Sequence, residues 1–263
     1  MDLGLKNKVA VVAAASQGLG RAIAEALAAE GARVALCSRD QTRIEAAAAH
    51  IRRKTSGEVL PVVADVTRAD EVNRFVDAVV ARWGTVHVAV ANAGGPPAKE
   101  FAQISLDDWQ KAVDLNLMSA VHLARAVLPR MRAQKWGRLI FLTSVAVKEP
   151  IAGLLLSNSI RSAVAGLAKS LANECAHENV LVNTVCPGYT RTERLEELAQ
   201  MLSQQRGQSL EEIVKGWTST IPMARLGDPE ELAALVVFLA SERASYITGT
   251  AIAVDGGRTR SLL

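Results

Sequence analysis

An apolar run leads directly into a glycine turn in the segment VAVVAAASQGLG, residues 9–20. A strand that is apolar throughout is buried on both faces of a sheet, so residues 9–15 are predicted to form a central strand. After the turn, residues 21–30 place Ile23 and Leu27 on one face of a predicted helix. A strand, a glycine turn and a helix in this order are typical of a dinucleotide site, where the helix N-terminus faces the pyrophosphate. An ordinary turn before a helix remains the alternative, because Ile23 stands where the common G-x-G-x-x-G pattern has its third glycine.

Outward from this turn, short apolar runs alternate with longer helical patterns. The further predicted strands are residues 34–37, 59–64, 86–91, 138–142, 180–185 and 251–254, and the further predicted helices are residues 42–54, 69–83, 106–133, 154–176 and one starting at Pro229. This alternation implies right-handed crossovers between parallel strands. We therefore predict an α/β fold of the Rossmann type, a doubly wound parallel sheet with helices on both faces.

The length of 263 residues, with 49% hydrophobic and 22% charged residues, is typical of a globular chain. We find no repeat or low-complexity linker, so residues 1–263 are predicted to form a single dinucleotide-binding domain. Residues 187–222 are the least regular segment and carry two weak helical patterns. A long excursion within a compact domain is usually functional, so this segment is predicted to be a lid or substrate loop.

Composition excludes several classes of function. Aromatic residues make up only 4%, which argues against stacking platforms for bases or sugars, and a net charge of +3 without a basic block argues against nucleic-acid binding. Three cysteines without paired spacing indicate reduced thiols in a cytoplasmic protein and no metal site. The N-terminus has no secretory h-region, and no apolar run approaches the roughly 20 residues of a membrane helix.

Short motifs follow the other predicted strands. They are Asp65 and Val66 after the third strand, Ala91 to Gly94 after the fourth, Ser144 after the fifth, Pro187 and Gly188 after the sixth, Asn116 within the helix over 106–133, and Asp255 to Gly257 near the end. In order and spacing, together with residues 12–20, they resemble the short-chain dehydrogenase/reductase family, in the style of 3-oxoacyl-acyl-carrier-protein reductases. The resemblance covers residues 5–258. It implies strand order 3-2-1-4-5-6-7, an oxidoreductase acting on a small carbonyl or alcohol, and a homotetramer or homodimer.

The resemblance also implies a set of cofactor-binding residues. They are Ala14, Ser16, Gln17, Gly18, Leu19, Gly20, Ser38, Arg39, Asp65, Val66, Asn92, Ala93, Gly94, Arg161, Pro187, Gly188, Thr190 and Thr192. At the end of the second strand, an arginine favours the 2′-phosphate of NADP, whereas an acid favours the ribose of NAD. Arg39 beside Ser38 therefore predicts NADP(H), with NAD(H) possible if Arg39 is only a solvated surface charge. Gln17 weakens this prediction slightly, because a basic residue there would help to hold the phosphate.

The chain departs from the family pattern in its catalytic residues. The family uses a tyrosine as proton donor, a lysine four residues later, a serine that orients the carbonyl and an asparagine that holds a water. Asn116 and Ser144 are in place, but Ser157 takes the tyrosine position and Arg161 the lysine position. An alkyl hydroxyl is a much weaker acid than a phenol, whose pKa is about 10. Loss of a general acid typically costs about 10²–10⁴-fold in rate.

Three interpretations follow from this departure. In the first, the chain is an oxidoreductase with a non-standard catalytic site of Asn116, Ser144, Ser157 and Arg161. In the second, it is an NADP(H)-binding pseudoenzyme or partner subunit. In the third, it catalyses another carbonyl reaction, with Arg161 stabilising an oxyanion. Tyr189 is a possible substitute donor, although packing is the simpler role for it.

Three further residues after the sixth predicted strand are candidates for ligand contacts. Thr192 matches a position that contacts the nicotinamide carboxamide. Arg191 and Arg194 are candidates for contact with an acidic substrate, the alternative being solvated charges on a flap helix.

Overall fold

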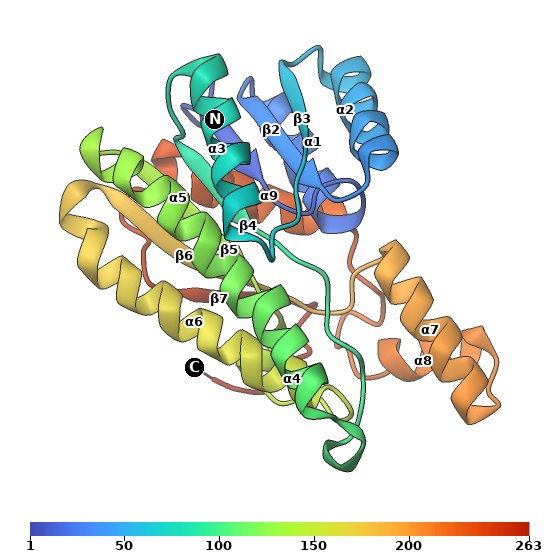
Figure 1. The fold of residues 1–263 in the computed structure, drawn as a ribbon. Helices are drawn as coiled ribbons and strands as arrows, with labels where there is room; N and C mark the ends of the chain where they lie inside the picture. Colours follow the sequence, from blue (N-terminus) through green and yellow to red (C-terminus); the bar gives the residue numbers. More distant parts are fainter. Residues whose placement is uncertain (263) are drawn as a thin grey trace.

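The computed structural model describes residues 1–262 and contains a seven-stranded parallel sheet of order β3-β2-β1-β4-β5-β6-β7 (Figure 1). The strands are β1 (Val9–Val12), β2 (Arg33–Ser38), β3 (Val59–Val63), β4 (Val88–Ala91), β5 (Gly137–Leu142), β6 (Val180–Pro187) and β7 (Ala251–Val254). The predicted Rossmann-type sheet and its strand order are confirmed. Residue 263, the last of the predicted domain, lies outside the described residues.

Helices cover both faces of the sheet. The helices are α1 (Gly18–Ala29), α2 (Gln41–Thr55), α3 (Ala69–Trp83), α4 (Leu106–Ala112), α5 (Ser119–Ala133), α6 (Leu155–Cys175), α7 (Glu193–Arg206), α8 (Leu210–Thr218) and α9 (Pro229–Ala240). The helices α1, α2 and α9 pack on one face and α3, α5 and α6 on the other, each side forming its own apolar core. No helix within residues 1–262 is long and apolar enough to cross a bilayer.

The helix predicted over residues 106–133 has these bounds, but it is not α-helical throughout. The segment forms α4 and α5, which are joined by a π-helical turn at Val113–Met118. Ser105 begins α4, because its hydroxyl accepts a hydrogen bond from the Asp108 backbone N–H at 3.0 Å. The turn is fixed by a tertiary contact, since Asn116 within it donates from Nδ2 to the Gly94 carbonyl at 2.8 Å. Such π-helical turns are frequent at functional sites.

The segment 187–222 contains the helices α7 and α8, which lie to one side of the sheet (Figure 1). Thr192 begins α7, its hydroxyl accepting from the Leu195 backbone N–H at 3.3 Å. Ser209 begins α8 with a capping box to Glu212. The two weak helical patterns of this segment therefore correspond to two capped helices.

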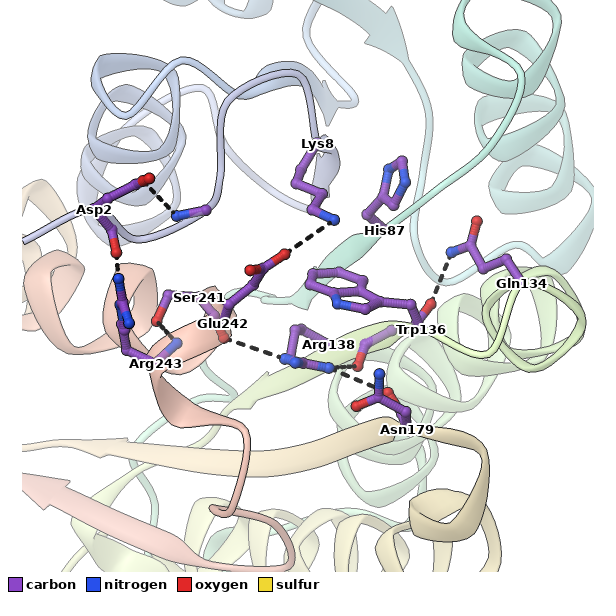
Figure 2. Close-up of polar contacts among 12 residues, drawn as sticks. Asp2, Lys8, His87, Gln134, Trp136, Arg138, Asn179, Ser241, Glu242 and Arg243 are labelled. Carbon is purple, nitrogen blue, oxygen red and sulfur yellow. Dashed lines mark hydrogen bonds and ion pairs between the residues drawn. The ribbon is translucent and has the colours of Figure 1, made fainter.

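A polar cluster closes the amino edge of the sheet, opposite the carboxyl ends of the strands (Figure 2). The ring of Trp136 lies between two cations, with Lys8 Nζ and the Arg138 guanidinium carbon each 4.2 Å from the ring centroid. Arg138, only 2% exposed, donates hydrogen bonds to the carbonyls of Gly137, Asn179 and Ser241. These contacts join the starts of β5 and β6 to the end of α9.

Candidate functional site

A cavity of about 620 Å³ follows the carboxyl edge of the sheet, where strand order reverses between β1 and β4. Ligands bind at this position in open α/β sheets. The predicted site residues that line it are Ala14, Ser16, Gln17, Gly18, Leu19, Ser38, Arg39, Asp65, Val66, Asn92, Ala93, Gly94, Ser144, Ser157, Arg161, Pro187, Gly188, Thr190 and Thr192. Two predicted residues, Gly20 and Asn116, do not line this cavity.

Gly20 supports the glycine turn from behind. A Cβ atom at Gly20 would lie 2.5 Å from the Ala14 carbonyl oxygen and 2.9 Å from Asn92 Nδ2, so only glycine fits. The Asn92 amide donates to the carbonyls of Ala13 at 3.2 Å and Ala14 at 3.1 Å. Asn92, which follows β4, therefore holds the glycine turn that follows β1. The exposed part of this turn faces the cavity.

Backbone conformation at the turn is costly at one residue. Gly18 has φ of 55°, which glycine adopts without strain, but Ala14 also has φ of 47°. A left-handed conformation costs an L-residue about 1–2 kcal/mol. Nothing in the sequence indicates this strain at Ala14, because alanine is a poor marker of left-handed turns.

Two arginines lie at the far end of the cavity, past β2. Arg39 Nη1 lies 3.9 Å from Asp65 Oδ2 and is largely exposed. Arg43 also lines the cavity, and its Nη1 donates to Gln17 Oε1 at 3.3 Å. Sequence reasoning missed Arg43, although it lies one turn beyond Arg39 in the first turn of α2. Arg43 supplies the basic group that Gln17 itself lacks.

Ser38 and Asp40 shape the same end of the cavity. Ser38 Oγ donates to the Asp40 carbonyl at 3.0 Å, and the Asp40 side chain accepts from the Arg43 backbone N–H at 2.9 Å to begin α2. Asp40 also forms an ion pair with the Arg43 side chain at 3.4 Å. The Asp40 carboxylate is thus engaged with the start of α2 and with Arg43.

Asp65 is fixed at the end of β3 by the residues that follow it. Its Oδ1 accepts hydrogen bonds from the backbone N–H and hydroxyl of Thr67, at 2.9 and 2.8 Å. The Asp65 backbone N–H donates to Glu71 at 2.8 Å. Asp65 and Val66 therefore form one wall of the cavity beside Arg39.

The predicted catalytic side chains meet at the other end of the cavity. Ser144 follows β5, and its Oγ accepts from the Ala146 backbone N–H at 3.1 Å, which leaves the hydroxyl hydrogen free to donate. Ser157 lies in the first turn of α6 and is 8% exposed. Arg161 lies one turn further along α6 and lines the same cavity. The structure thus brings together three of the four predicted catalytic residues.

Backbone carbonyls hold Arg161 in place. Its Nη1 donates to the carbonyls of Thr143 at 2.9 Å and Leu142 at 3.3 Å, and its Nη2 donates to that of Gly94 at 3.3 Å. Burial lowers the pKa of Arg161 to about 10, an effect that the nearby charge of Arg194 reinforces. The guanidinium therefore stays charged at neutral pH, and it lies half-buried in the wall of the cavity.

Asn116 lies behind this site. It is 5% exposed and borders a separate cavity of about 10 Å³, which Arg161 also borders. Its Oδ1 is buried and accepts no hydrogen bond within the described residues. A cavity of this volume with polar walls fits about one water molecule.

The segment after β6 contributes two threonines and one packed aromatic ring. Thr190 and Thr192 line the cavity, whereas Tyr189 stacks on Trp217 of α8 with 5.1 Å between ring centroids. The Arg258 guanidinium lies 5.1 Å from the Tyr189 ring on this same side of the segment. Tyr189 therefore packs between the flap and the C-terminal segment, and it does not line the cavity.

The first turn of α7 closes over the cavity. Glu193 lies 3.8 Å from Arg21 of α1, and its carboxylate would lie 3.5 Å from a Cβ at Gly18. Arg194 lines the cavity, whereas Arg191 pairs with Asp228 at 2.7 Å outside it. Glu193 carried no signal in the sequence, because its position depends on how the flap folds back.

Comparison with known proteins agrees with this geometry. A family model described as enoyl-(acyl carrier protein) reductase matches residues 13–259. The 3-oxoacyl-[acyl-carrier-protein] reductase of Aquifex aeolicus is 34% identical over 257 residues, 98% of this chain and 99% of that protein. Human dehydrogenase/reductase SDR family member 4 is 35% identical over 259 residues, 96% of this chain and 88% of that protein.

A solved structure is equally similar. The L-sorbose reductase of Gluconobacter frateurii, solved as a complex with NADPH and L-sorbose, has a TM-score of 0.95 and 35% identity over 100% of both chains. Relatives that are named reductases and dehydrogenases thus match this chain along its whole length in sequence and structure. The chain belongs to the short-chain dehydrogenase/reductase family of oxidoreductases.

Proposed function

We propose that this protein transfers a hydride between NADP(H) and a small carbonyl or alcohol substrate in the cavity at the carboxyl edge. One observation carries the proposal: a single cavity joins the glycine turn and Arg39 to Ser144 and Arg161. Its volume of about 620 Å³ lies in the range of ligand sites, roughly 300–1,000 Å³.

The residues present fit this cofactor. Gly18 presents its backbone at the N-terminus of α1, which favours a pyrophosphate, and Ser38, Arg39 and Arg43 offer donors for a 2′-phosphate. When bound, the nicotinamide supplies or accepts the hydride. NADPH is also the cofactor in the L-sorbose reductase complex.

Cofactor choice is tested by fluorescence titration with NADPH and NADH. We expect NADPH to bind at least about tenfold more tightly, and Arg39→Gln with Arg43→Gln to remove that difference, because charged hydrogen bonds contribute about 1.5–3 kcal/mol. Equal affinities in the unmodified protein would contradict the assignment. Arg53→Gln, on the far turn of α2, is the matched control.

At the other end, each side chain has a proposed role. The Ser144 hydroxyl donates to the substrate oxygen, Asn116 holds a water through its free Oδ1, and Arg161 holds the nicotinamide ribose and stabilises negative charge on the substrate oxygen. Ser157 binds a water or a substrate group in the space that a longer side chain would fill. The proton then comes from water, because Tyr189 is stacked on Trp217 and Tyr246 is fully exposed.

The non-standard site is tested by the double substitution Ser157→Tyr with Arg161→Lys. If the geometry is that of the family, we expect turnover of a carbonyl panel to rise by about 10²-fold or more, the usual contribution of a general acid. Each single substitution is the control. A double variant that binds NADPH normally and gains no activity would contradict this account of the site.

The second candidate function is an NADP(H)-binding protein without turnover. The absence of a phenol from the described cavity favours it. NADPH binding without oxidation across ketoacyl, quinone, sugar and steroid carbonyls would support this alternative over hydride transfer.

Three further features belong to the same proposal. We propose that residues 1–263 form one domain, with 187–222 as a flap over the substrate, and that copies associate as a homotetramer or homodimer. The half-buried edge strand β7 supports association, because sheet edges are usually covered. Buried, unpaired Cys37, Cys175 and Cys186 support a cytoplasmic location. Light scattering of the purified protein tests the oligomeric state.

A further inference from the structure

Arg161 carries a charge that no carboxylate of the described residues 1–262 neutralises. Its three hydrogen bonds all go to neutral carbonyls, through Nη1 and Nη2, and Nε–H donates to none of these residues. Arg161 is half-buried, and a cation that is partly removed from water is stabilised by an ion pair. A cation left in this state beside a cavity favours an anionic ligand.

A second guanidinium lies at the same place. Arg194 of α7 donates from Nη2 to the Pro96 carbonyl at 3.4 Å, and its Nε would lie 3.7 Å from a Cβ at Gly95. Arg161 contacts the preceding residue, Gly94. The two arginines therefore approach successive residues of one loop from α6 and from the flap. The partner of Arg194 is Glu197, at 3.5 Å, with both side chains more than half exposed.

The phosphates of the proposed cofactor do not account for these charges. The pyrophosphate belongs at Gly18, and the 2′-phosphate belongs between Arg39 and Arg43, at the other end of the cavity. Arg161 lies instead at the carbonyls of Leu142 and Thr143, next to Ser144. An anion at this end therefore comes from the substrate.

We propose that the substrate is an oxo acid or the corresponding hydroxy acid, whose carboxylate binds Arg161 with the support of Arg194. This inference rests on the proposed function and specifies its substrate class. A guanidinium binds a carboxylate through paired hydrogen bonds, which fixes orientation as well as affinity. A carboxylate on Arg161 directs the neighbouring carbonyl toward Ser144 and Ser157, where the shorter serine side chain leaves room.

The first test measures binding, not turnover. Calorimetry of the protein saturated with NADP⁺ compares oxamate with its neutral amide oxamide, and levulinate with methyl levulinate. We expect the carboxylate of at least one pair to bind tenfold or more tightly, and added salt to reduce that difference. If neither carboxylate is preferred while NADP⁺ binds normally, the inference is overturned and the proposed function stands.

A failure of the proposed function gives a different result. If NADPH and NADP⁺ do not bind, hydride transfer is excluded, and the same two pairs are titrated without cofactor. A preference for the carboxylate then supports the anion site on its own, and equal binding overturns it.

Variants locate the site. Arg194→Gln is expected to weaken the preferred carboxylate threefold to tenfold and to leave the Kd of NADPH unchanged. Arg191→Gln is the matched control, since Arg191 is on the same segment but pairs with Asp228 outside the cavity. Arg161→Lys keeps the charge but loses the paired hydrogen bonds of a guanidinium, so we expect the preferred carboxylate to bind tenfold or more weakly. Equal effects of Arg194→Gln and Arg191→Gln would remove Arg194 from the proposal.

Discussion

Arg138 is buried at the start of β5, and Arg161 of α6 is half-buried at the opposite end of this strand. Each donates to three backbone carbonyls, and burial lowers the pKa of each to about 10. Arg138 lies at the amino edge, where Trp136 covers its guanidinium and almost none of it is exposed (Figure 2). Arg161 lies at the carboxyl edge and faces the large cavity.

This difference separates a structural cation from a binding cation. At Arg138 the protein supplies an aromatic face and carbonyls, so the charge is satisfied within the fold. At Arg161 the carbonyls hold the side chain but the protein supplies neither an ion pair nor an aromatic ring within the described residues. We infer that the carboxyl edge keeps an unsatisfied charge for ligands, while the amino edge fastens the sheet.

The largest effect is expected at Arg138. Arg138→Met removes the hydrogen bonds to Asn179 and Ser241 and the contact with Trp136, so we expect a loss of about 3 kcal/mol in unfolding free energy. Urea denaturation measures it. The folded variant should bind NADPH with unchanged Kd, and weakened NADPH binding would contradict a purely structural role.

Arg161→Met is expected to weaken cofactor binding and to change stability little, the reverse of Arg138→Met. The carbonyls that it frees border a cavity that water can enter, so unfolding free energy should change by less than about 1 kcal/mol. The Kd of NADPH should rise about tenfold or more, since hydrogen bonds from a charged group contribute about 1.5–3 kcal/mol. If Arg161→Met destabilises the protein as much as Arg138→Met does, the two arginines do not differ in role.

His87 makes the amino edge sensitive to pH. Its Nδ1 accepts from the Val9 N–H at 3.0 Å, and burial with the charge of Lys8 lowers the pKa of His87 to about 4. The unfolded chain therefore binds the proton first, so stability is complete above about pH 6.5 and falls as the pH drops toward 4.

Between pH 6.5 and 4, we expect His87 to lower the free energy of unfolding by about 2 kcal/mol. This is less than its full pKa shift implies, because the ring is only half-buried. His87→Asn keeps an acceptor but does not titrate, so its Tm should fall less between pH 6.5 and 4.5. If the Tm of both proteins falls equally between pH 6.5 and 4.5, His87 does not cause the pH dependence of stability.

The smallest expected effect concerns the strained turn at the carboxyl edge. Ala14→Gly relieves the φ of 47°, and we expect it to raise unfolding free energy by about 1 kcal/mol and Tm by roughly 2–4 °C. Ala13→Gly is the control and should destabilise, because Ala13 is buried in ordinary backbone geometry. A neutral or destabilising Ala14→Gly would show that the turn is not strained.

The sequence predicted the fold well because the strands are buried on both faces. Helix α3 and strand β7 begin and end where their patterns predict, since Trp83 is followed by a glycine and Val254 by Asp255. The helix over 106–133 has its predicted bounds, but the π-helical turn within it was not predicted because hydrophobic spacing continues through the turn. Only the tertiary contact between Asn116 and Gly94 marks this turn.

Residues that line the cavity were predicted where a motif follows a strand, as at Asn92 and Ser144, and Arg161 of α6 was predicted from its place in the family pattern. Arg43 and Glu193 were missed because they lie on helices, where their approach to the cavity depends on packing. Arg138 was also missed as a structural group. Within an apolar strand pattern, a single arginine gives no sign that Trp136 covers it.

The π-helical turn at Val113–Met118 also sets the register of everything that follows it. A π turn holds one residue more than an α turn, so the same residues in continuous α-helical geometry would rotate α5 by about 100° relative to α4. Leu123, Val127 and Met131 would then leave the core they share with α3. A single-residue deletion inside α5 should therefore be far more harmful than one in this turn, which can return to α-helical geometry without rotating α5.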